Sequence, residues 1–171
     1  RYTQAQDTLA SLVEKFTGNG AESPSIVPAL VEQARLNAVL GNSTGAQAAL
    51  VRAQGILEKF LRAEHSSLLA LSIERVAVAL LSADWAEAQN LLLRLATPLR
   101  RLGNPNHPIA LQAQAQLAEL ALARGQRDAA RGALETMALA TTSMPTLHPL
   151  KLRLLALQAE LAAQEGDFSR V

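Results

Sequence analysis

Hydrophobic residues recur along the chain with the spacing of an α-helix. After His107-Pro108, apolar residues form a wide stripe with polar residues interspersed. The stripe consists of Ile109, Leu111, Leu117, Ala118, Leu120, Ala121 and Leu122, and the polar residues are Gln112, Gln116 and Glu119. No stretch alternates convincingly with a period of two, as a half-buried strand would. The pattern therefore predicts an all-α protein.

Two series of residues divide the chain into repeats. In the first series, a Gly or Ala ends an apolar stretch, at spacings of 42, 42 and 41 residues, and a small residue follows five positions later. The pairs are Gly41 and Ala46, Ala83 and Ala88, Gly125 and Ala130, and Gly166 and Val171. The second series begins those stretches with the same spacing: Ser23-Pro24, His65-Ser66, His107-Pro108 and His148-Pro149. The sequence therefore predicts units 23–64, 65–106 and 107–147 between partial units 1–22 and 148–171.

Each unit predicts two helices joined by a tight turn. A proline in the first turn lacks only an amide that would have no partner there, and Ser23 or Asn106 can cap the free amides. Glycine at the end of a helix adopts the left-handed backbone that stops it, as expected at Gly41 and Gly125. The predicted helices span residues 3–16, 25–40, 44–62, 66–82, 84–101, 108–123, 126–140 and 148–164.

Small residues at equivalent positions predict how these helices pack. Ala34, Val76, Ala118 and Ala159 would let the two helices of a unit approach closely, as would the Ala or Val that follows each turn. A single helix pair cannot bury its apolar stripe, whereas stacked pairs cover one another. The repeat therefore predicts one superhelical solenoid of antiparallel helix pairs over residues 1–171.

The repeat resembles a known family. His107-Pro108-Ile109-Ala110, Leu117-Ala118-Glu119-Leu120 and the run from Gly125 to Ala130 are similar to the tetratricopeptide repeat of the kinesin-light-chain type, and the resemblance covers about four units. It implies a right-handed superhelix whose first helices line a concave groove for a peptide or partner segment. The residues that it marks as structural are Gly41, Ala46, Ala83, Ala88, His107, Pro108, Ala118, Gly125, Ala130, His148, Pro149 and Gly166.

The remaining chemistry of the chain is sparse. A formal charge of +1 argues against a general nucleic-acid binder, and the absence of cysteine excludes disulfides and thiolate sites. No phosphate loop, serine-nucleophile elbow or zinc-protease motif occurs. His65, His107 and His148 occupy equivalent positions about 10–20 Å apart and cannot share one metal ion. We therefore expect no enzyme activity, no cofactor, no metal, and a structural role for the histidines at the starts of helices.

The compartment stays open on the same grounds. The most apolar stretch, from Val76 to Ala83, is far shorter than the roughly 20 residues that span a bilayer. A chain without cysteine suits both the cytoplasm and the periplasm. The chain begins at Arg1 and stops at Val171, where the repeat predicts the start of a new helix, so we expect a fragment of a larger protein.

Polar residues on the first helices are the candidate binding residues. If these helices line a groove, as the resemblance implies, the groove carries Arg35, Gln112, Glu119, Arg153, Glu160 and Gln164, with Val31, Ile73, Leu80 and Leu122 as apolar neighbours. Peptide recognition combines apolar anchors with charges that select partners. An ordinary solvated face would look the same in sequence.

These features favour a protein–protein interaction or scaffolding module within a larger regulatory protein. Ala- and Leu-rich bacterial arrays of this kind look like regions attached to signalling proteins, such as serine/threonine kinases and transcription regulators. Two alternatives remain open. A small-ligand-sensing domain predicts a closed pocket, and a spacer or homodimerisation unit predicts an apolar patch at an open end of the solenoid.

Overall fold

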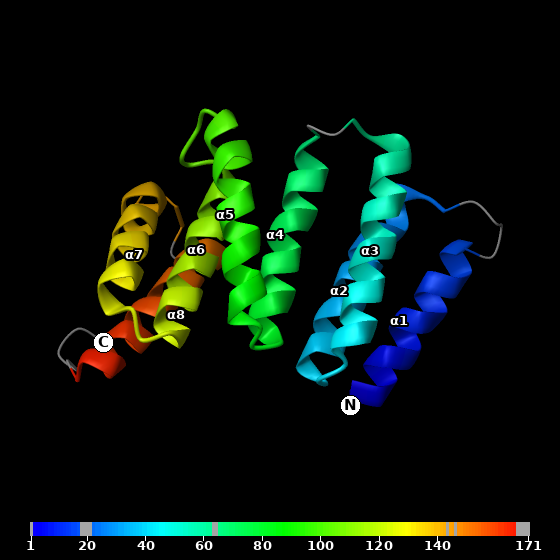
Figure 1. Ribbon diagram of the computed structural model, residues 1–171, viewed down its shortest axis with the longest axis horizontal. Coiled ribbons are helices and arrows are strands. Elements are labelled where there is room, and N and C mark those ends of the chain that lie inside the picture. The colour runs from blue at the N-terminus through cyan, green and yellow to red at the C-terminus, as the bar shows by residue number, and fades with distance from the viewer. Residues whose placement is uncertain (1, 18–21, 63–64, 143, 146, 167–171) are drawn as a thin grey trace. The chain divides into compact units, whose positions relative to one another are not determined.

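The computed structural model describes residues 2–17, 22–62, 65–142, 144–145 and 147–166. Within these ranges the chain is all α-helical and contains no strand, as the hydrophobic pattern predicts. The helices are α1 (Tyr2–Thr17), α2 (Val27–Val39), α3 (Ser43–Phe60), α4 (Ser66–Leu81), α5 (Trp85–Arg101), α6 (Pro108–Ala123), α7 (Arg127–Thr141) and α8 (Pro149–Glu165), with a short 3-10 helix, η1 (Pro24–Ile26), before α2 (Figure 1). Predicted and observed bounds differ by at most two residues.

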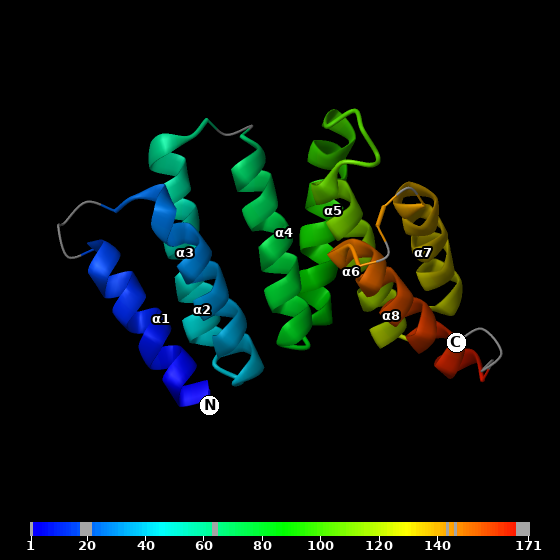
Figure 2. The same ribbon diagram turned by 180° about the vertical axis from the view of Figure 1, so that it is seen from behind.

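The chain forms two compact units whose boundary lies within α5. The first unit, Arg1–Leu91, contains α1 to α4 and the start of α5, and α2 packs against α1, α3 and α4. Figures 1 and 2 show α2 and α3 side by side. The apolar core of this unit is built mainly from these helices and includes Ile26, Leu30, Ala34, Ala46, Leu50, Ala53, Ile56 and Leu71.

The second unit, Leu92–Val171, contains the rest of α5 and α6 to α8. Here α6 packs against both α7 and α8, in the same order as α2 against α3 and α4. Its core includes Ala115, Ala118, Leu122, Ala130, Leu134, Met137, Leu154 and Leu157. The apolar stripe of α2 is therefore buried by α3 and α4 in the first unit, and that of α6 by α7 and α8 in the second.

The small residues lie where the helices of a pair meet. Ala34 and Ala118 are fully buried, and Ala46 and Ala130 on the following helices are buried to the same degree. Val76 and Ala88 are also inaccessible to solvent. Ala159 is half-buried, and Val171, the last member of the series, lies outside the described residues. The close approach of paired helices requires these short side chains.

The turns that close the first helices use left-handed backbone. Gly41, Gly125 and Gly166 have φ angles of 75°, 68° and 73°, the conformation that glycine adopts without a steric penalty. Ala83 takes the equivalent place with φ 54°, the one positive value at a non-glycine residue in the described ranges. The repeat therefore imposes the same turn even where the sequence supplies an alanine.

The starts of the helices depend on side chains that accept backbone hydrogen bonds. Ser23 Oγ accepts from the Ser25 amide at 3.4 Å, at the start of η1. At α6 the cap is His107, and not Asn106 as the sequence had indicated, because the residue next to Pro108 occupies the capping position. The Asn106 amide instead donates to Asn104 Oδ1 at 2.9 Å within the preceding turn.

Among the described residues, no helix combines the length and apolar character that a bilayer span needs.

Candidate partner-binding surface

In the first unit, an ion pair joins the two first helices. Arg35 on α2 donates from Nε to Glu74 Oε2 on α4 at 3.1 Å, and its Nη2 also contacts that oxygen. Its Nη1 lies 3.0 Å from Glu32 Oε1, one turn earlier on α2. The Arg35 side chain is 39% exposed and that of Glu74 is 22% exposed. Arg35 therefore reaches the surface with its charge already balanced by two carboxylates.

The second unit contains the same kind of contact with the charges reversed. Glu119 on α6 occupies the repeat position of Arg35, and its Oε1 accepts from Arg153 Nε on α8 at 2.8 Å. Arg153 Nη2 lies 2.6 Å from the same oxygen. Two of the predicted groove residues are thus brought together and bind each other. In both units, this position links one first helix to the next.

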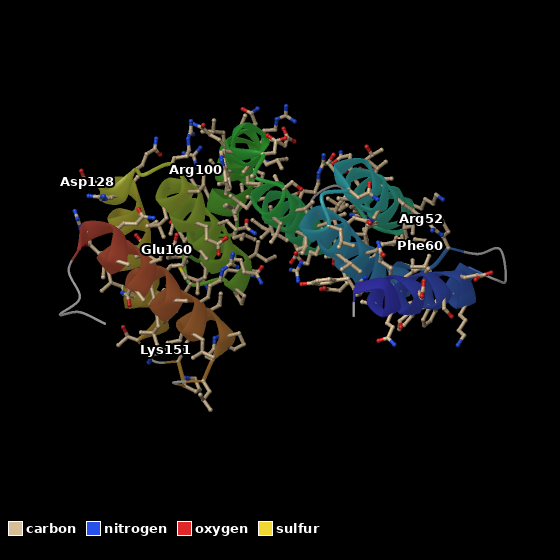
Figure 3. All side chains as sticks on the ribbon, turned by 90° about the horizontal axis from the view of Figure 1, so that it is seen from below. Arg52, Phe60, Arg100, Asp128, Lys151 and Glu160 are labelled. Atoms are coloured by element: carbon tan, nitrogen blue, oxygen red, sulfur yellow. The ribbon has the colours of Figure 1, made fainter. Side chains whose placement is uncertain are left out.

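The other predicted residues have different surroundings. Gln164 Nε2 donates to the carbonyl oxygen of Leu122 at 3.3 Å, so its side chain satisfies the end of α6. Gln112 is half-buried on α6, and Glu160 is exposed on α8 (Figure 3). Four of the six residues therefore take part in contacts between neighbouring helices, and Glu160 is the most open to a partner.

The apolar neighbours predicted for the groove belong to the interior instead. Val31, Ile73 and Leu122 are at most 9% exposed, and Leu80 is half-buried. Val31 and Leu122 belong to the core clusters of the two units, so their side chains face the core. The sequence pattern alone does not distinguish an apolar residue at the edge of the stripe from one at its centre.

Two other apolar residues on the first helices of the first unit are exposed and occupy equivalent repeat positions. Val39 and Leu81 are 52% and 49% exposed, and they lie 42 residues apart in the last turns of α2 and α4. Val39 follows Arg35 by one helical turn, and Leu81 follows Glu74 by two. We call these four residues, Arg35, Val39, Glu74 and Leu81, the first-unit surface. The equal repeat position of Val39 and Leu81 is the sequence signal that could have revealed them.

The second unit exposes apolar residues on its last helix. Leu152 and Leu155 on α8 are 47% and 49% exposed. Ala156 and Ala163 are also exposed, although their repeat equivalents on α6, Ala115 and Leu122, are buried beneath α7. This α8 face is therefore an exposed apolar patch of the second unit.

A cavity of the first unit opens to solvent. It has a volume of about 630 Å³ and lies between α3, α4 and the beginning of α5. Its wall includes Val51, which is 56% exposed, and the charged residues Arg75, Asp84 and Glu87. Arg75 donates to Gln54 Oε1 at 2.9 Å, and Asp84 Oδ1 accepts from the Glu87 amide at 3.1 Å. An open cleft of this kind differs from the closed pocket that a ligand sensor predicts.

The perturbed ionisable groups are in ion pairs that connect elements. The pKa of the Glu22 carboxyl is lowered by hydrogen bonds from Arg52 and then Lys59 on α3, at 3.0 and 3.1 Å. Contacts with Glu165 and then Asp128 raise the pKa of Arg131 on α7. Asp128 lies at the start of α7 (Figure 3). The described residues include no group of three ligands placed to hold a metal ion.

Comparison of the chain with protein-family models, with curated proteins and with solved structures found no match. The repeat is therefore supported by features of the molecule itself. These features are the spacing of the turns, the buried alanines within each helix pair, and the equivalent positions of Arg35 and Glu119. The tetratricopeptide resemblance and the solenoid arrangement stay predictions.

Proposed function

We propose that the chain is a non-catalytic protein–protein interaction module that holds a peptide or partner segment against its first helices. It would serve as a scaffolding or regulatory part of a larger signalling protein, such as a bacterial serine/threonine kinase or transcription regulator. The observation that carries the proposal is the exposure of Val39 and Leu81 at equivalent repeat positions, one turn beyond Arg35 on α2 and two turns beyond Glu74 on α4.

Apolar anchors supply most of the binding energy in such contacts, and nearby charges select the partner. Val39 and Leu81 each leave about half of their surface uncovered. The charges of Arg35, Glu32 and Glu74 already balance one another in part, so they favour hydrogen bonding to a partner over strong attraction of one charge sign. The expected partner segment is therefore apolar with flanking polar groups, and not strongly acidic or basic.

The test removes the anchors without disturbing the ion pair. A Val39→Ser/Leu81→Ser variant and the wild type are used to capture proteins from the native extract, which are identified by mass spectrometry. A Leu139→Ser variant is the matched control, because Leu139 is 80% exposed on α7. We expect a partner that is retained by the control and lost by the double variant. A partner retained by both variants would remove the first-unit surface from the proposal.

The α8 face supports a second candidate, self-association. Leu152 and Leu155 expose apolar surface where a neighbouring copy could pack. Sedimentation equilibrium of the wild type and of a Leu152→Ser/Leu155→Ser variant separates the two functions. A dimer that dissociates in the variant favours homodimerisation, and a wild type that is monomeric at high concentration argues against it.

A further inference from the structure

Three histidines cap three helices in the same way. His65, His107 and His148 precede α4, α6 and α8, and each has extended backbone with φ between −61° and −66°. In each, Nδ1 accepts a hydrogen bond from the amide two residues later, at 3.1 Å from Ser67, 3.2 Å from Ile109 and 3.3 Å from Leu150. The same atom of the same residue type therefore satisfies one free amide at each of these helix starts.

This bond requires a neutral imidazole. Nδ1 can accept only when the ring carries its single proton on Nε2, whereas a protonated ring carries a proton on both nitrogens. Protonation therefore turns the acceptor into a donor that faces another donor. It also adds a positive charge at the end of the helix where the backbone dipole is already positive. Both effects oppose the capped conformation.

Several cations lie near the histidines along the chain, and one carboxylate, Glu64, directly precedes His65 and lies outside the described residues. Before His65, Lys59 and Arg62 lie near the end of α3. Before His107, Arg100 and Arg101 are the last residues of α5. After His148, Lys151 lies in the first turn of α8. Lys59 is bound to Glu22, and Lys151 Nζ donates to the Met144 carbonyl oxygen at 3.2 Å. Among the carboxylates of the helices that pack on these starts, Glu58 on α3 accepts from Gln54, Glu119 binds Arg153, and Glu135 lies near the middle of α7. Within the part of the chain that the structure describes, none of these hydrogen bonds and ion pairs gives a protonated capping imidazole a carboxylate partner.

The repeat over residues 23–64 has a serine, Ser23, at the position that histidine occupies in the later repeats. Ser23 caps η1 through its hydroxyl oxygen, with the same two-residue spacing to the amide donor. A hydroxyl does not titrate between about pH 5 and 8, the range in which histidine exchanges its proton. We infer that His65, His107 and His148 are pH-sensitive caps, which release the first turns of α4, α6 and α8 on acidification. This inference is independent of the proposed partner binding.

The test replaces the three histidines by serine, the cap that the repeat over residues 23–64 already uses. Urea unfolding of the wild type and of a His65→Ser/His107→Ser/His148→Ser variant is followed from about pH 8 to about pH 5.5. A cap changes the folding equilibrium constant by roughly five-fold. We expect the wild type to lose about that factor for each histidine that becomes protonated, and the variant to lose much less. Equal pH dependence in the two proteins would overturn the inference.

A second measurement does not depend on the stability of the triple variant. Nitrogen NMR of the wild-type imidazoles at about pH 8 distinguishes a bare Nδ1 from a protonated one. We expect the proton on Nε2 in all three rings, and a lower protection of the Ser67, Ile109 and Leu150 amides against exchange, relative to their intrinsic exchange rates, on acidification. Protons on Nδ1 at high pH, or exchange rates at these amides that follow only the general pH effect, would contradict the inference.

Discussion

Glu119 on α6 and Arg153 on α8 bind each other across two successive first helices, with 2.8 Å between Oε1 and Nε. Both side chains are about one-third exposed, at 30% and 34%. A partly exposed ion pair of this kind stabilises a protein by up to about 1 kcal/mol. The pair also sets the register between the two helices, because it fixes which turn of α8 lies beside which turn of α6.

The first prediction concerns that pair. Glu119→Arg places two cations side by side and should lower the free energy of unfolding by about 1 kcal/mol. Adding Arg153→Glu restores opposite charges and should recover most of that loss. Urea unfolding of the two single variants and the double variant measures the coupling between the residues. Strictly additive effects would mean that the pair does not form in solution.

The second prediction concerns the tight packing of α6 against α7. Ala118→Leu and Ala130→Leu each insert a larger side chain at a site with no exposed surface, and should destabilise the protein by about 1–3 kcal/mol. Ala129→Leu is the control, because Ala129 precedes Ala130 on α7 but is exposed. Thermal unfolding of the three variants gives the comparison. A variant at position 130 that melts like the control would place the α6–α7 contact elsewhere.

The third prediction distinguishes glycines within helix α3. A Cβ added at Gly55 would meet nothing within 4 Å, so Gly55→Ala should stabilise the helix by about 0.5–1 kcal/mol. A Cβ at Gly45 would lie 2.5 Å from Nδ2 of Asn42, whose Oδ1 caps α3 by accepting from the Gly45 amide at 3.0 Å. Gly45→Ala should therefore destabilise the protein by displacing the cap. Denaturant midpoints that rise equally for both variants would show that Asn42 moves aside without cost.

The fourth prediction uses the turn at Ala83. Its φ of 54° costs an alanine about 1 kcal/mol that glycine avoids. Ala83→Gly should therefore raise the melting temperature by about 1–2 °C, because the greater freedom of glycine in the unfolded chain offsets part of the gain. Ala86→Gly, in the first turns of α5, is a control that should lower it. A melting temperature that falls in both variants would contradict the left-handed turn.

The fifth prediction follows from the lowered pKa of Glu22. Because the folded protein holds this carboxylate with hydrogen bonds from Arg52 and Lys59, the unfolded chain binds the proton more readily. The stability that Glu22 contributes is present above the ordinary glutamate pKa of about 4.3 and is lost as the pH falls through the lower folded value. Glu22→Gln should therefore flatten the fall in stability between about pH 5 and 3.

The control for that experiment is Glu135→Gln, which removes a carboxylate from the exposed side of α7. Urea midpoints measured over the same pH range should follow the wild type in this control. If Glu22→Gln also follows the wild type, the ion pairs to α3 contribute nothing to the acid sensitivity of folding.

The sequence by itself determined the helices and their ends. Proline, histidine and serine at the starts, and glycine at the stops, act through the backbone of their own few residues, so their spacing predicted every helix to within two residues. The burial of Ala34, Ala46, Ala118 and Ala130 could also be anticipated, because the repeat places a small residue at each pair contact. The choice between Asn106 and His107 as cap was missed by one residue.

Only the tertiary structure decided which surface residues remain available. Arg35 and Glu74 are 39 residues apart, and Glu119 and Arg153 are 34 residues apart, so their pairing depends on how one helix is turned against the next. The same rotation buries Val31 and leaves Val39 exposed, although both are valines on α2. The division within α5, after Leu91, likewise depends on contacts between distant residues. Local signals fix a helix, but the neighbours that cover it are a property of packing alone.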